Sequence, residues 1–438
     1  MSGRIKDSFP QTSSLPRAPI RLGLCARIYS GGTPDKNNEE FWTDGDLPWI
    51  GSGEVNQSLI MQPTAHITEQ AVRGSATKLF PQGSLVMALA GQGKTKATVA
   101  QMGIDAFGNQ SLACIDDYKG HNRYLFWWLR SLYREIRGLS SQDTRDGLNQ
   151  SMLGQIPVPD IDLDTQKSIA DFLDRETARI DQLIEKRDRF ASLVREARDA
   201  RIAVSLVGPS SMEPNSRWLA RLPEGWLAQR AKVHFRERQE RSATGDEELL
   251  TVSHLTGVTR RSEKDVNMFL AESNEGYKVV YQGDIVINTM WAWMGAMGVS
   301  PVHGIISPSY GIYHPVSAAL LPEYVERLIR SKPFVAEATR RSKGIHSSRL
   351  RLYPDAFLDM LLPIPPIDAQ EALLADLNSR IDTEDRLLLK NEEARALLLE
   401  FRSALITAAV TGQIDVTTWG KQGSTDRRLD QIEEEMSA

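Results

Sequence analysis

A glycine-rich pentapeptide is the segment that most resembles a catalytic motif. Residues 91–95 (GQGKT) follow a short apolar run that is typical of a strand, and they match the end of a phosphate-binding loop. The full motif also needs a glycine seven positions before Thr95, where this sequence has Ala88. An ATP-binding enzyme that uses Gly91 to Thr95 is therefore one hypothesis for this chain.

An internal repeat favours a different interpretation of the same loop. The corresponding loop in the second half, residues 289–295, reads TMWAWMG, which no longer resembles a nucleotide site. A loop that meets a different part of a variable ligand in each half explains both versions. Glycine allows close backbone approach, lysine suits phosphates, and tryptophan suits bases or sugars. The candidate binding residues in the two loops are Gln92, Lys94, Thr95, Lys96, Trp291 and Trp293.

A basic stretch in the second half is a further candidate for nucleic-acid contact. Residues 339–353 (TRRSKGIHSSRLRLY) carry five Arg and Lys residues and no acid. Such side chains bind phosphates, and Arg, Ser and His can also read base edges. The corresponding first-half stretch, residues 138–151, is less basic but rich in polar residues; an ordinary solvated loop is the alternative for both. The candidates are Arg340, Arg341, Lys343, His346, Ser347 and Arg349, with Arg145 and Asn149 in the first half.

A third basic group lies between residues 230 and 241, where Glu237 and Glu240 interrupt it. Alternating charges are as typical of an ordinary surface as of a binding site, and Arg236 and Arg238 are its candidate DNA contacts. The sequence has no methyl-transfer motif, glycine-rich cofactor loop, nucleophile elbow or zinc-protease helix. These absences favour a recognition module, with no catalytic residue and no metal ligand predicted.

Two long amphipathic segments repeat along the chain and must position these loops. Residues 166–208 and 370–412 align without a gap at an offset of 204, and each follows a Pro-x-Pro preface. Their heptad-like apolar pattern predicts two helices of roughly 60 Å. We expect the two helices to pack antiparallel against each other; two unrelated helices in a common core are the alternative. The residues predicted to form the helix pair are Leu173, Ile180, Ile184, Val194, Leu377, Leu388, Leu398 and Phe401.

The regions before the two helices are also related. Residues 82–86 (QGSLV) align with residues 282–286 (QGDIV) at an offset of 200, so we expect two similar domains of α/β (α+β) class. The predicted divisions are a flexible N-terminus (1–16), a first domain (17–152), a first helix region (153–212), a second domain (213–358), a second helix region (359–412) and a flexible tail (413–438).

Composition limits where and how such a protein works. The 438 residues carry a net charge of −5, so any DNA-binding surface must be local. Cys25 and Cys114 are the two cysteines, which suits a reducing cytosol and predicts no disulfide framework. No apolar run reaches about 18 residues, so no membrane span is expected. We expect a cytoplasmic protein.

Several motifs together resemble the specificity (S) subunit of type I restriction–modification systems. The likeness covers nearly all of residues 17–416, and the first helix departs from its twin only by two extra residues within 160–165. The motifs that carry it are residues 30–34 (SGGTP), 41–50 (FWTDGDLPWI), 283–288 (GDIVIN), 304–310 (GIISPSY), 367–370 (IDAQ) and 409–416 (AVTGQIDV).

The resemblance implies a division of labour within a methyltransferase complex that serves antiviral defence. Each domain would be a target recognition domain that reads one half of a split, asymmetric duplex DNA sequence. The paired helices would form a coiled-coil-like spacer and dock two methyltransferase (M) subunits. The M subunits would bring S-adenosylmethionine, and motor-nuclease (R) subunits would bring ATP and Mg²⁺. This chain would then be a non-catalytic DNA reader without a cofactor of its own. A protein scaffold that ignores DNA is a further alternative.

Overall fold

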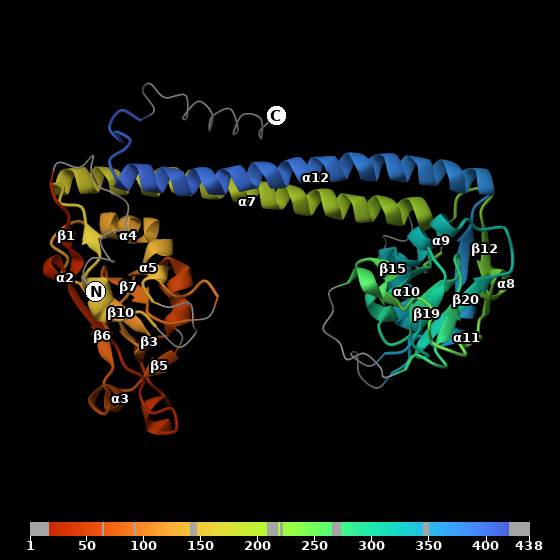
Figure 1. Ribbon diagram of the computed structural model, residues 1–438, viewed down its shortest axis with the longest axis horizontal. Coiled ribbons are helices and arrows are strands. Elements are labelled where there is room, and N and C mark those ends of the chain that lie inside the picture. Colours follow the sequence, from red (N-terminus) through yellow and green to blue (C-terminus); the bar gives the residue numbers. More distant parts are fainter. Residues whose placement is uncertain are drawn as a thin grey trace. The chain divides into compact units, whose positions relative to one another are not determined.

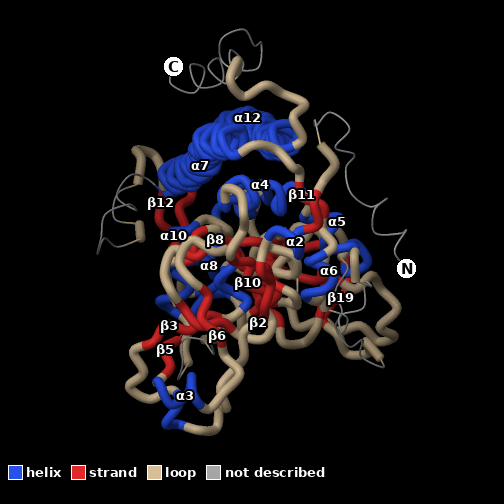
Figure 2. Tube along the Cα trace, turned by 90° about the vertical axis from the view of Figure 1, so that its left-hand side faces the viewer, coloured by secondary structure: helices blue, strands red, loops and turns tan. Residues whose placement is uncertain are grey.

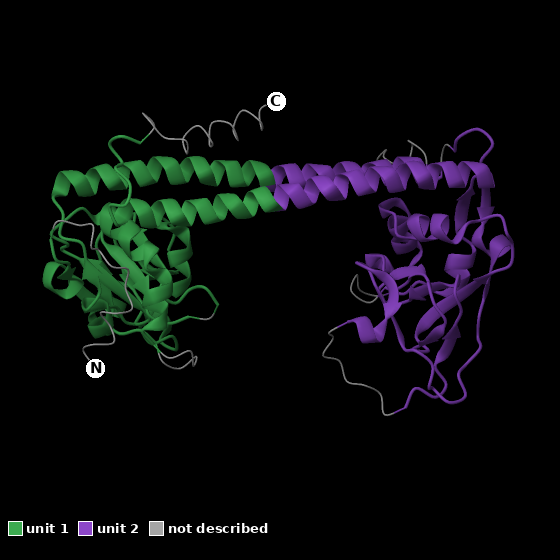
Figure 3. Cartoon of the chain, turned by 45° about the horizontal axis from the view of Figure 1, so that its top comes forward, with its two compact units in different colours: residues 1–187, 393–438 green, residues 188–392 purple. Residues whose placement is uncertain are grey.

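The computed structural model describes residues 17–63, 65–91, 93–140, 147–207, 218–219, 222–264, 273–344 and 350–419. The chain forms two compact units (Figure 3): unit 1 comprises residues 1–187 and 393–438, and unit 2 comprises residues 188–392. Two long helices, α7 (Leu163–Val207) and α12 (Ile367–Val410), contribute to both units (Figure 1). This combination of mixed sheets and long helices confirms the predicted fold class.

Unit 1 is built on a five-stranded sheet with the strand order β2-β10-β7-β8-β4. Its central strands are antiparallel, and β7 and β8 form a hairpin. A second sheet has the order β5-β3-β9-β6, and β1 pairs with β11. The strands are β1 (Ile20–Arg21), β2 (Arg27–Ser30), β3 (Leu47–Ile50), β4 (Leu59–Ile60), β5 (Ala65–Ile67), β6 (Lys78–Phe80), β7 (Leu85–Ala88), β8 (Val99–Met102), β9 (Ala106–Gly108), β10 (Leu112–Asp116) and β11 (Pro157–Val158). The shorter helices are α2 (Leu22–Cys25), α3 (Glu69–Arg73), α4 (Asn122–Ser131), α5 (Tyr133–Gly138) and α6 (Gln150–Gly154), with 3₁₀ turns η1 (Glu39–Phe41) and η2 (Ser52–Gln57).

Unit 2 is built on a four-stranded sheet with the order β13-β20-β17-β18. Three strand pairs, β12–β21, β14–β15 and β16–β19, complete it. The strands are β12 (Leu227–Arg230), β13 (Phe235–Glu237), β14 (Leu250–Ser253), β15 (Gly257–Arg260), β16 (Lys278–Val280), β17 (Ile285–Asn288), β18 (Met297–Val299), β19 (Gly304–Ile306), β20 (Tyr310–Pro315) and β21 (Leu361–Ile364). The shorter helices are α8 (Ala231–His234), α9 (Pro322–Ile329), α10 (Lys332–Arg341) and α11 (Pro354–Leu358), with 3₁₀ turns η4 (Arg261–Glu263) and η5 (Ala292–Met294).

The two units share one scaffold. The strand order β2-β10-β7-β8 in unit 1 recurs as β13-β20-β17-β18 in unit 2. The edge pair β1–β11 recurs as β12–β21, and the helices α4, α5 and α6 recur as α9, α10 and α11 in the same chain order. The repeat that the sequence indicates is therefore a repeat of the domain fold.

A buried helix joins each sheet to the long helices. In unit 1 this helix is α4, whose residues 124–129 are all buried, as expected for a helix that is apolar on every side. It lies between the sheet and the paired long helices (Figure 2). The hydroxyl of Tyr124 donates to the carbonyl oxygen of Val410 at 3.2 Å, and in unit 2 the hydroxyl of Tyr324 lies 3.5 Å from the carbonyl oxygen of Leu206. Both contacts therefore use equivalent positions of the repeat.

Two buried glutamines add hydrogen bonds to the same junction between each domain and its long helix. The side chain of Gln166 accepts from the backbone N–H of His121 at 2.8 Å, and Gln370 accepts from Leu321 at 2.9 Å. His121 and Leu321 cap the N-termini of α4 and α9, whose first N–H groups lack helical partners. Each glutamine also donates to a carbonyl five residues earlier in the chain. The long helices are thus attached to the domains at the first residue of each predicted repeat.

Within each unit, α7 and α12 run antiparallel, as predicted. Arg402 forms a two-pronged ion pair with Asp181 in unit 1, at 2.7 and 2.9 Å. At the equivalent positions of unit 2, Arg198 pairs with Asp385 at 2.6 Å. The predicted spacer residues are buried (Leu173, Ile180, Leu377 and Leu398) or half-buried (Ile184, Val194, Leu388 and Phe401).

Both long helices lie within the predicted helix regions, 153–212 and 359–412. Both helices begin three residues before the repeats, at Leu163 and Ile367. Gly412 has a φ of +72°, a left-handed conformation that ends α12. The tail is not loose directly after it, because Ile414, Val416 and Trp419 pack against the apolar core of unit 1. Residues 1–16 and 420–438 lie outside the described residues.

Candidate nucleic-acid interface

In unit 2 the structure brings the tryptophan loop and the basic stretch together. The backbone N–H of Leu352 donates to the carbonyl of Thr289 at 3.0 Å, which joins the segment before α11 to the loop after β17. Arg351 lies 3.6 Å from the sulfur of Met290, and the Thr339 hydroxyl lies 3.3 Å from the Trp293 carbonyl. Two segments that are far apart in the sequence therefore form one surface.

The tryptophan loop presents a large apolar side chain to solvent. The rings of Trp291 and Trp293 stack, with centroids 6.1 Å apart and planes inclined by 17°. The indole N–H of Trp293 donates to the Met290 carbonyl at 3.0 Å, and Gly295 closes the turn with a φ of +84°. Trp291 is 49% exposed. Exposing an apolar ring to water is energetically unfavourable, and a ring held in this way suits stacking on a base or sugar.

The arginines that begin the basic stretch are held by an acid. Arg340 makes a two-pronged contact with buried Glu337 at 2.7 Å, and Arg341 bonds the same carboxylate at 2.5 Å. Burial alone would raise the pKa of Glu337, but these two arginines outweigh it and lower the pKa. Glu337 thus holds both arginines, and their side chains are 68% exposed at Arg340 and 25% at Arg341. Their contact with phosphates stays a prediction.

The rest of the stretch is partly described. Lys343 is exposed, and its backbone forms two 2.9 Å hydrogen bonds with Arg351 that close the segment between them. The candidates His346, Ser347 and Arg349 lie outside the described residues.

Unit 1 joins the corresponding segments in the same way. The backbone N–H of Leu148 donates to the carbonyl of Leu89 at 2.8 Å, as Leu352 does to Thr289 in unit 2. Side chains of α5 bind backbone carbonyls of the loop after β7. The guanidinium of Arg137 donates to the carbonyl of Gly93 at 2.6 Å, and the hydroxyl of Tyr133 donates to the carbonyl of Lys94 at 2.9 Å.

The structure places the first-half candidates in different roles. The side chain of Lys94 is exposed, and Thr95 is half-buried. The ammonium group of Lys96 donates a hydrogen bond to the hydroxyl of Ser140 at 2.6 Å, so part of its donor capacity is used within unit 1. Asn149 caps α6, because its amide oxygen accepts from the backbone N–H of Met152 at 3.0 Å, and the residue is exposed. Its contact with DNA stays a prediction. Gln92 and Arg145 lie outside the described residues.

The same loop does not have the geometry of an ATP-binding motif. A phosphate-binding loop connects a strand to a helix, whose N-terminus faces the phosphates. Here the loop connects β7 to β8 as a hairpin. The ATP-binding alternative therefore lacks its structural context.

The third basic group is mainly structural. Arg238 forms a two-pronged pair with buried Asp284, at 2.8 and 3.2 Å, and its guanidinium lies over the ring of Tyr281. These contacts hold the Arg238 side chain within unit 2, and its contact with DNA stays a prediction. Arg236 is exposed on β13, where it donates to the carbonyls of Phe235 and Lys232.

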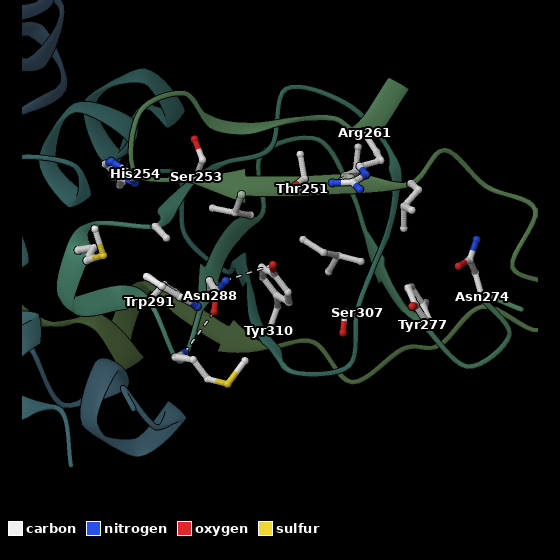
Figure 4. A pocket seen from close by; sticks show the side chains of 17 residues that line it. Thr251, Ser253, His254, Arg261, Asn274, Tyr277, Asn288, Trp291, Ser307 and Tyr310 are labelled. Carbon is white, nitrogen blue, oxygen red and sulfur yellow. Dashed lines mark hydrogen bonds between the residues drawn. The ribbon is translucent and has the colours of Figure 1, made fainter. Parts of the chain in front are cut away.

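A cavity that the sequence did not predict lies next to the tryptophan loop. It is open to solvent on one side, has a volume of about 520 Å³ and is lined mainly by β14, the loop after β17 and the β19–β20 turn (Figure 4). Asn288 and Tyr310, which face each other across β17 and β20, lie side by side in its lining. The amide of Asn288 donates to the hydroxyl of Tyr310 at 3.1 Å. The one signal in the sequence is that Asn288 replaces Ala88 of the first half.

The described residues contain neither a metal-ligand cluster nor a helix that could span a membrane. Among the described residues, no cluster of three or more His, Cys, Asp or Glu side chains could hold a metal ion. In the same part of the chain, no helix combines the length and apolarity needed to cross a bilayer. Cys25 and Cys114 are both buried free thiols.

The sequence comparisons all match proteins of type I restriction systems over parts of this chain. Residues 20–188 match the model of the type I restriction modification DNA specificity domain. The chain is 42% identical over 66 residues to the EcoR124I/EcoR124II specificity subunit of Escherichia coli, and 25% identical over 192 residues to the EcoprrI specificity subunit of the same species. These segments cover 15% and 40% of this chain, and 16% and 43% of those relatives, so the chain matches less than half the length of either.

Solved structures share the fold over most of the chain. One is a chain from a study of complex assembly and conformational transition in a type I R-M system, with a TM-score of 0.68 and 15% identity over 91% of this chain and 99% of that chain. Another is the HsdS subunit of Thermoanaerobacter tengcongensis, with a TM-score of 0.52 and 14% identity over 91% of this chain and 98% of that chain. The family match assigns a type I restriction modification DNA specificity domain to residues 20–188, and the solved structures show a shared fold over most of the chain. By partial sequence matches and by fold, the chain is similar to type I restriction–modification specificity subunits.

Proposed function

We propose that the chain is the DNA-reading subunit of a type I methyltransferase complex, and that each unit reads one half of a bipartite duplex target. The observation that supports this most is the contrast between scaffold and loops. Four strands of the main sheet keep the same order in both units, but the loop after β7 carries Lys94 and Lys96, whereas the loop after β17 carries Trp291 and Trp293. A common scaffold with different loops gives two half-sites of different sequence.

Base and phosphate contacts would have separate roles in this interface. Exposed Lys94, Arg236, Arg340 and Lys343 supply phosphate contacts, which contribute affinity but no sequence information. The tryptophan loop, the candidates outside the described residues (Gln92, Arg145, His346, Ser347 and Arg349) and the remaining polar side chains supply specificity. Catalysis belongs to partner subunits in this proposal: S-adenosylmethionine to the M subunits, and ATP and Mg²⁺ to the R subunits.

The long helices would dock two M subunits. The buried residues of the helix pair hold α7 and α12 together, so docking falls to exposed side chains. Leu193 and Leu397 occupy equivalent positions of the repeat and are 54% and 57% exposed. One lies in each unit. Exposed leucines at matched positions fit two copies of the same partner.

Binding by the assembled complex tests the DNA-reading function. We expect the chain with its M partner to shift a duplex in a sequence-selective manner that weakens as salt rises. A complex that assembles but selects no duplex would support the scaffold alternative instead.

The docking and spacing roles have separate tests. Leu193→Asp and Leu397→Asp should each lower the stoichiometry from two M subunits to one, whereas Leu255→Asp, at a 75% exposed site on a unit 2 turn, should leave it unchanged.

Shortening both α7 and α12 by whole turns should change the separation of the half-sites; an unchanged separation rejects the spacer role.

A further inference from the structure

The Asn288–Tyr310 pair is not required by the fold. In unit 1 the same cross-strand position of the sheet is occupied by Ala88 and Leu112, which pair across β7 and β10 and are fully buried. Unit 2 has the same strand order but places an amide and a phenol there. Since an apolar pair serves the scaffold equally well, the polar pair indicates a role of its own.

The pair is arranged to present one hydrogen-bond donor to the cavity. The amide oxygen of Asn288 accepts from the backbone N–H of Met290 at 3.2 Å, and its NH₂ donates to the hydroxyl of Tyr310 at 3.1 Å. The Asn288 side chain is therefore fixed. The Tyr310 hydroxyl accepts from Asn288 and keeps its own proton to donate. Burial raises the pKa of Tyr310 despite the hydrogen bond from Asn288, so the hydroxyl remains protonated.

The remaining lining suits a flat aromatic ring. Met290, Trp291 and Met294 provide an apolar wall, and Trp291 is exposed although its partner Trp293 stacks on it. Thr251 and Ser307 add hydroxyl groups to the surrounding wall (Figure 4). The volume of about 520 Å³ lies within the roughly 300–1,000 Å³ that is usual for small-molecule sites.

The charges around the cavity suit a ring that is attached to phosphates. None of the seventeen described residues that line it is acidic, and Arg261 is among them. At the rim, the guanidinium of Arg351 lies 3.6 Å from the sulfur of Met290. Exposed Lys343 is paired with Arg351 through the backbone.

We infer that this cavity receives one base of the bound DNA, with Trp291 against its face and the Tyr310 hydroxyl donating to an acceptor on its edge. A base within a stacked duplex exposes only its edges, and protein groups must protrude to reach them. This site is concave, so the base must leave the stack to enter it. The inference rests on the proposed DNA-reading function and adds a residue-level specificity site to unit 2.

The test uses the chain in complex with its M partner and duplexes that carry one abasic site at each position of the target in turn. On the intact duplex, Trp291→Ala should weaken binding roughly tenfold through lost stacking. At one position of one half-site, the abasic site should weaken the wild-type complex to a similar extent but cause no further loss in Trp291→Ala. Tyr310→Phe should relax the base preference at that same position.

A mismatch opposite the coupled base shows whether the base leaves the stack. Unpairing costs less at a mismatch, so wild-type binding should tighten there; weaker binding would mean that the base is read inside the duplex, which overturns the inference. Tyr281→Phe is the matched control, because this half-exposed tyrosine bonds Glu240 outside the cavity.

The outcomes separate this inference from the proposal on which it rests. If the wild-type complex selects no duplex, the DNA-reading function fails. If it selects its target and both cavity variants behave like Tyr281→Phe, only the base-binding cavity fails. Thermal unfolding of Tyr310→Phe, which keeps the ring, confirms that unit 2 remains folded in the comparison.

Discussion

The helix pair makes contacts at equivalent positions in both units, but the chemistry differs at one layer. In unit 1 this layer contains Ile180 and Leu405, which are 0% and 3% exposed in the apolar core. At the equivalent positions of unit 2, Glu384 and Arg201 form an ion pair, and Arg198 bonds the same carboxylate at 2.7 Å. The neighbouring layer is an Arg–Asp pair in both units.

This difference shows that the repeat preserves the position of the contact and not the interaction itself. An apolar layer and a charged layer can occupy the same site because each one satisfies its own side chains. In unit 1 apolar side chains pack on each other, and in unit 2 the buried carboxylate receives hydrogen bonds from two arginines. A mixed layer would leave a charge unpaired against a methyl group, which is costly. The loops follow the same rule, with lysines in unit 1 and tryptophans in unit 2 on a common scaffold.

The largest effect is expected in the apolar layer. Leu405→Ala opens a cavity in the core of unit 1 and should lower the free energy of unfolding by about 2–5 kcal/mol. Leu399→Ala, at a 44% exposed site on the same helix, is the control and should change it by less than about 0.5 kcal/mol. Denaturant unfolding measures both; equal effects would show that the layer is not packed as described.

The charged layer should respond to pH as well as to substitution. Burial alone would raise the pKa of Glu384, but the hydrogen bonds from Arg201 and Arg198 lower it below its ordinary value of 4.5. The ionised group thus contributes stability that is fully present above pH 4.5 and is lost as the pH falls through the lowered folded pKa. Glu384→Gln should cost about 1–3 kcal/mol at neutral pH.

The same variant supplies the pH test. The difference in unfolding free energy between Glu384→Gln and the wild type should shrink as the solution is acidified below pH 4.5. A difference that stays constant down to pH 2 would mean that Glu384 does not ionise with a lowered pKa in the folded chain.

Copying one layer onto the other gives a smaller effect. Glu384→Ile with Arg201→Leu gives unit 2 the residues of unit 1, and the double variant should lie within about 1 kcal/mol of the wild type. Each single change leaves one partner unmatched and should be less stable than the double. If the two losses simply add, the layers are not equivalent.

Much of the scaffold could be predicted from the sequence because its signals are periodic or repeated. The long helices follow from the apolar spacing, and the related domains follow from the offset of 200. The roles of individual polar residues could not be predicted. Arg238 is 46 residues from Asp284 in the sequence, and Asn288 is 22 from Tyr310. Only the fold shows which of these side chains are engaged.

The two loops offer the smallest effect. Lys94→Ala removes a candidate phosphate contact from unit 1 and should weaken binding a few-fold for every duplex, while lowering the salt dependence by about one charge. Trp291→Ala should leave the salt dependence unchanged, because it removes no charge. Titrations of the complex at several salt concentrations compare them; a change of sequence preference in Lys94→Ala would contradict a phosphate role.

The most direct measurement is the methylated sequence itself. Residues 213–358 can be exchanged for the equivalent domain of another specificity subunit, and the methylome of a host with the M partner then gives the target. The account predicts that one half of the bipartite sequence changes while the other half and their separation persist. A change in both halves, or in neither, would contradict two independent readers on one scaffold.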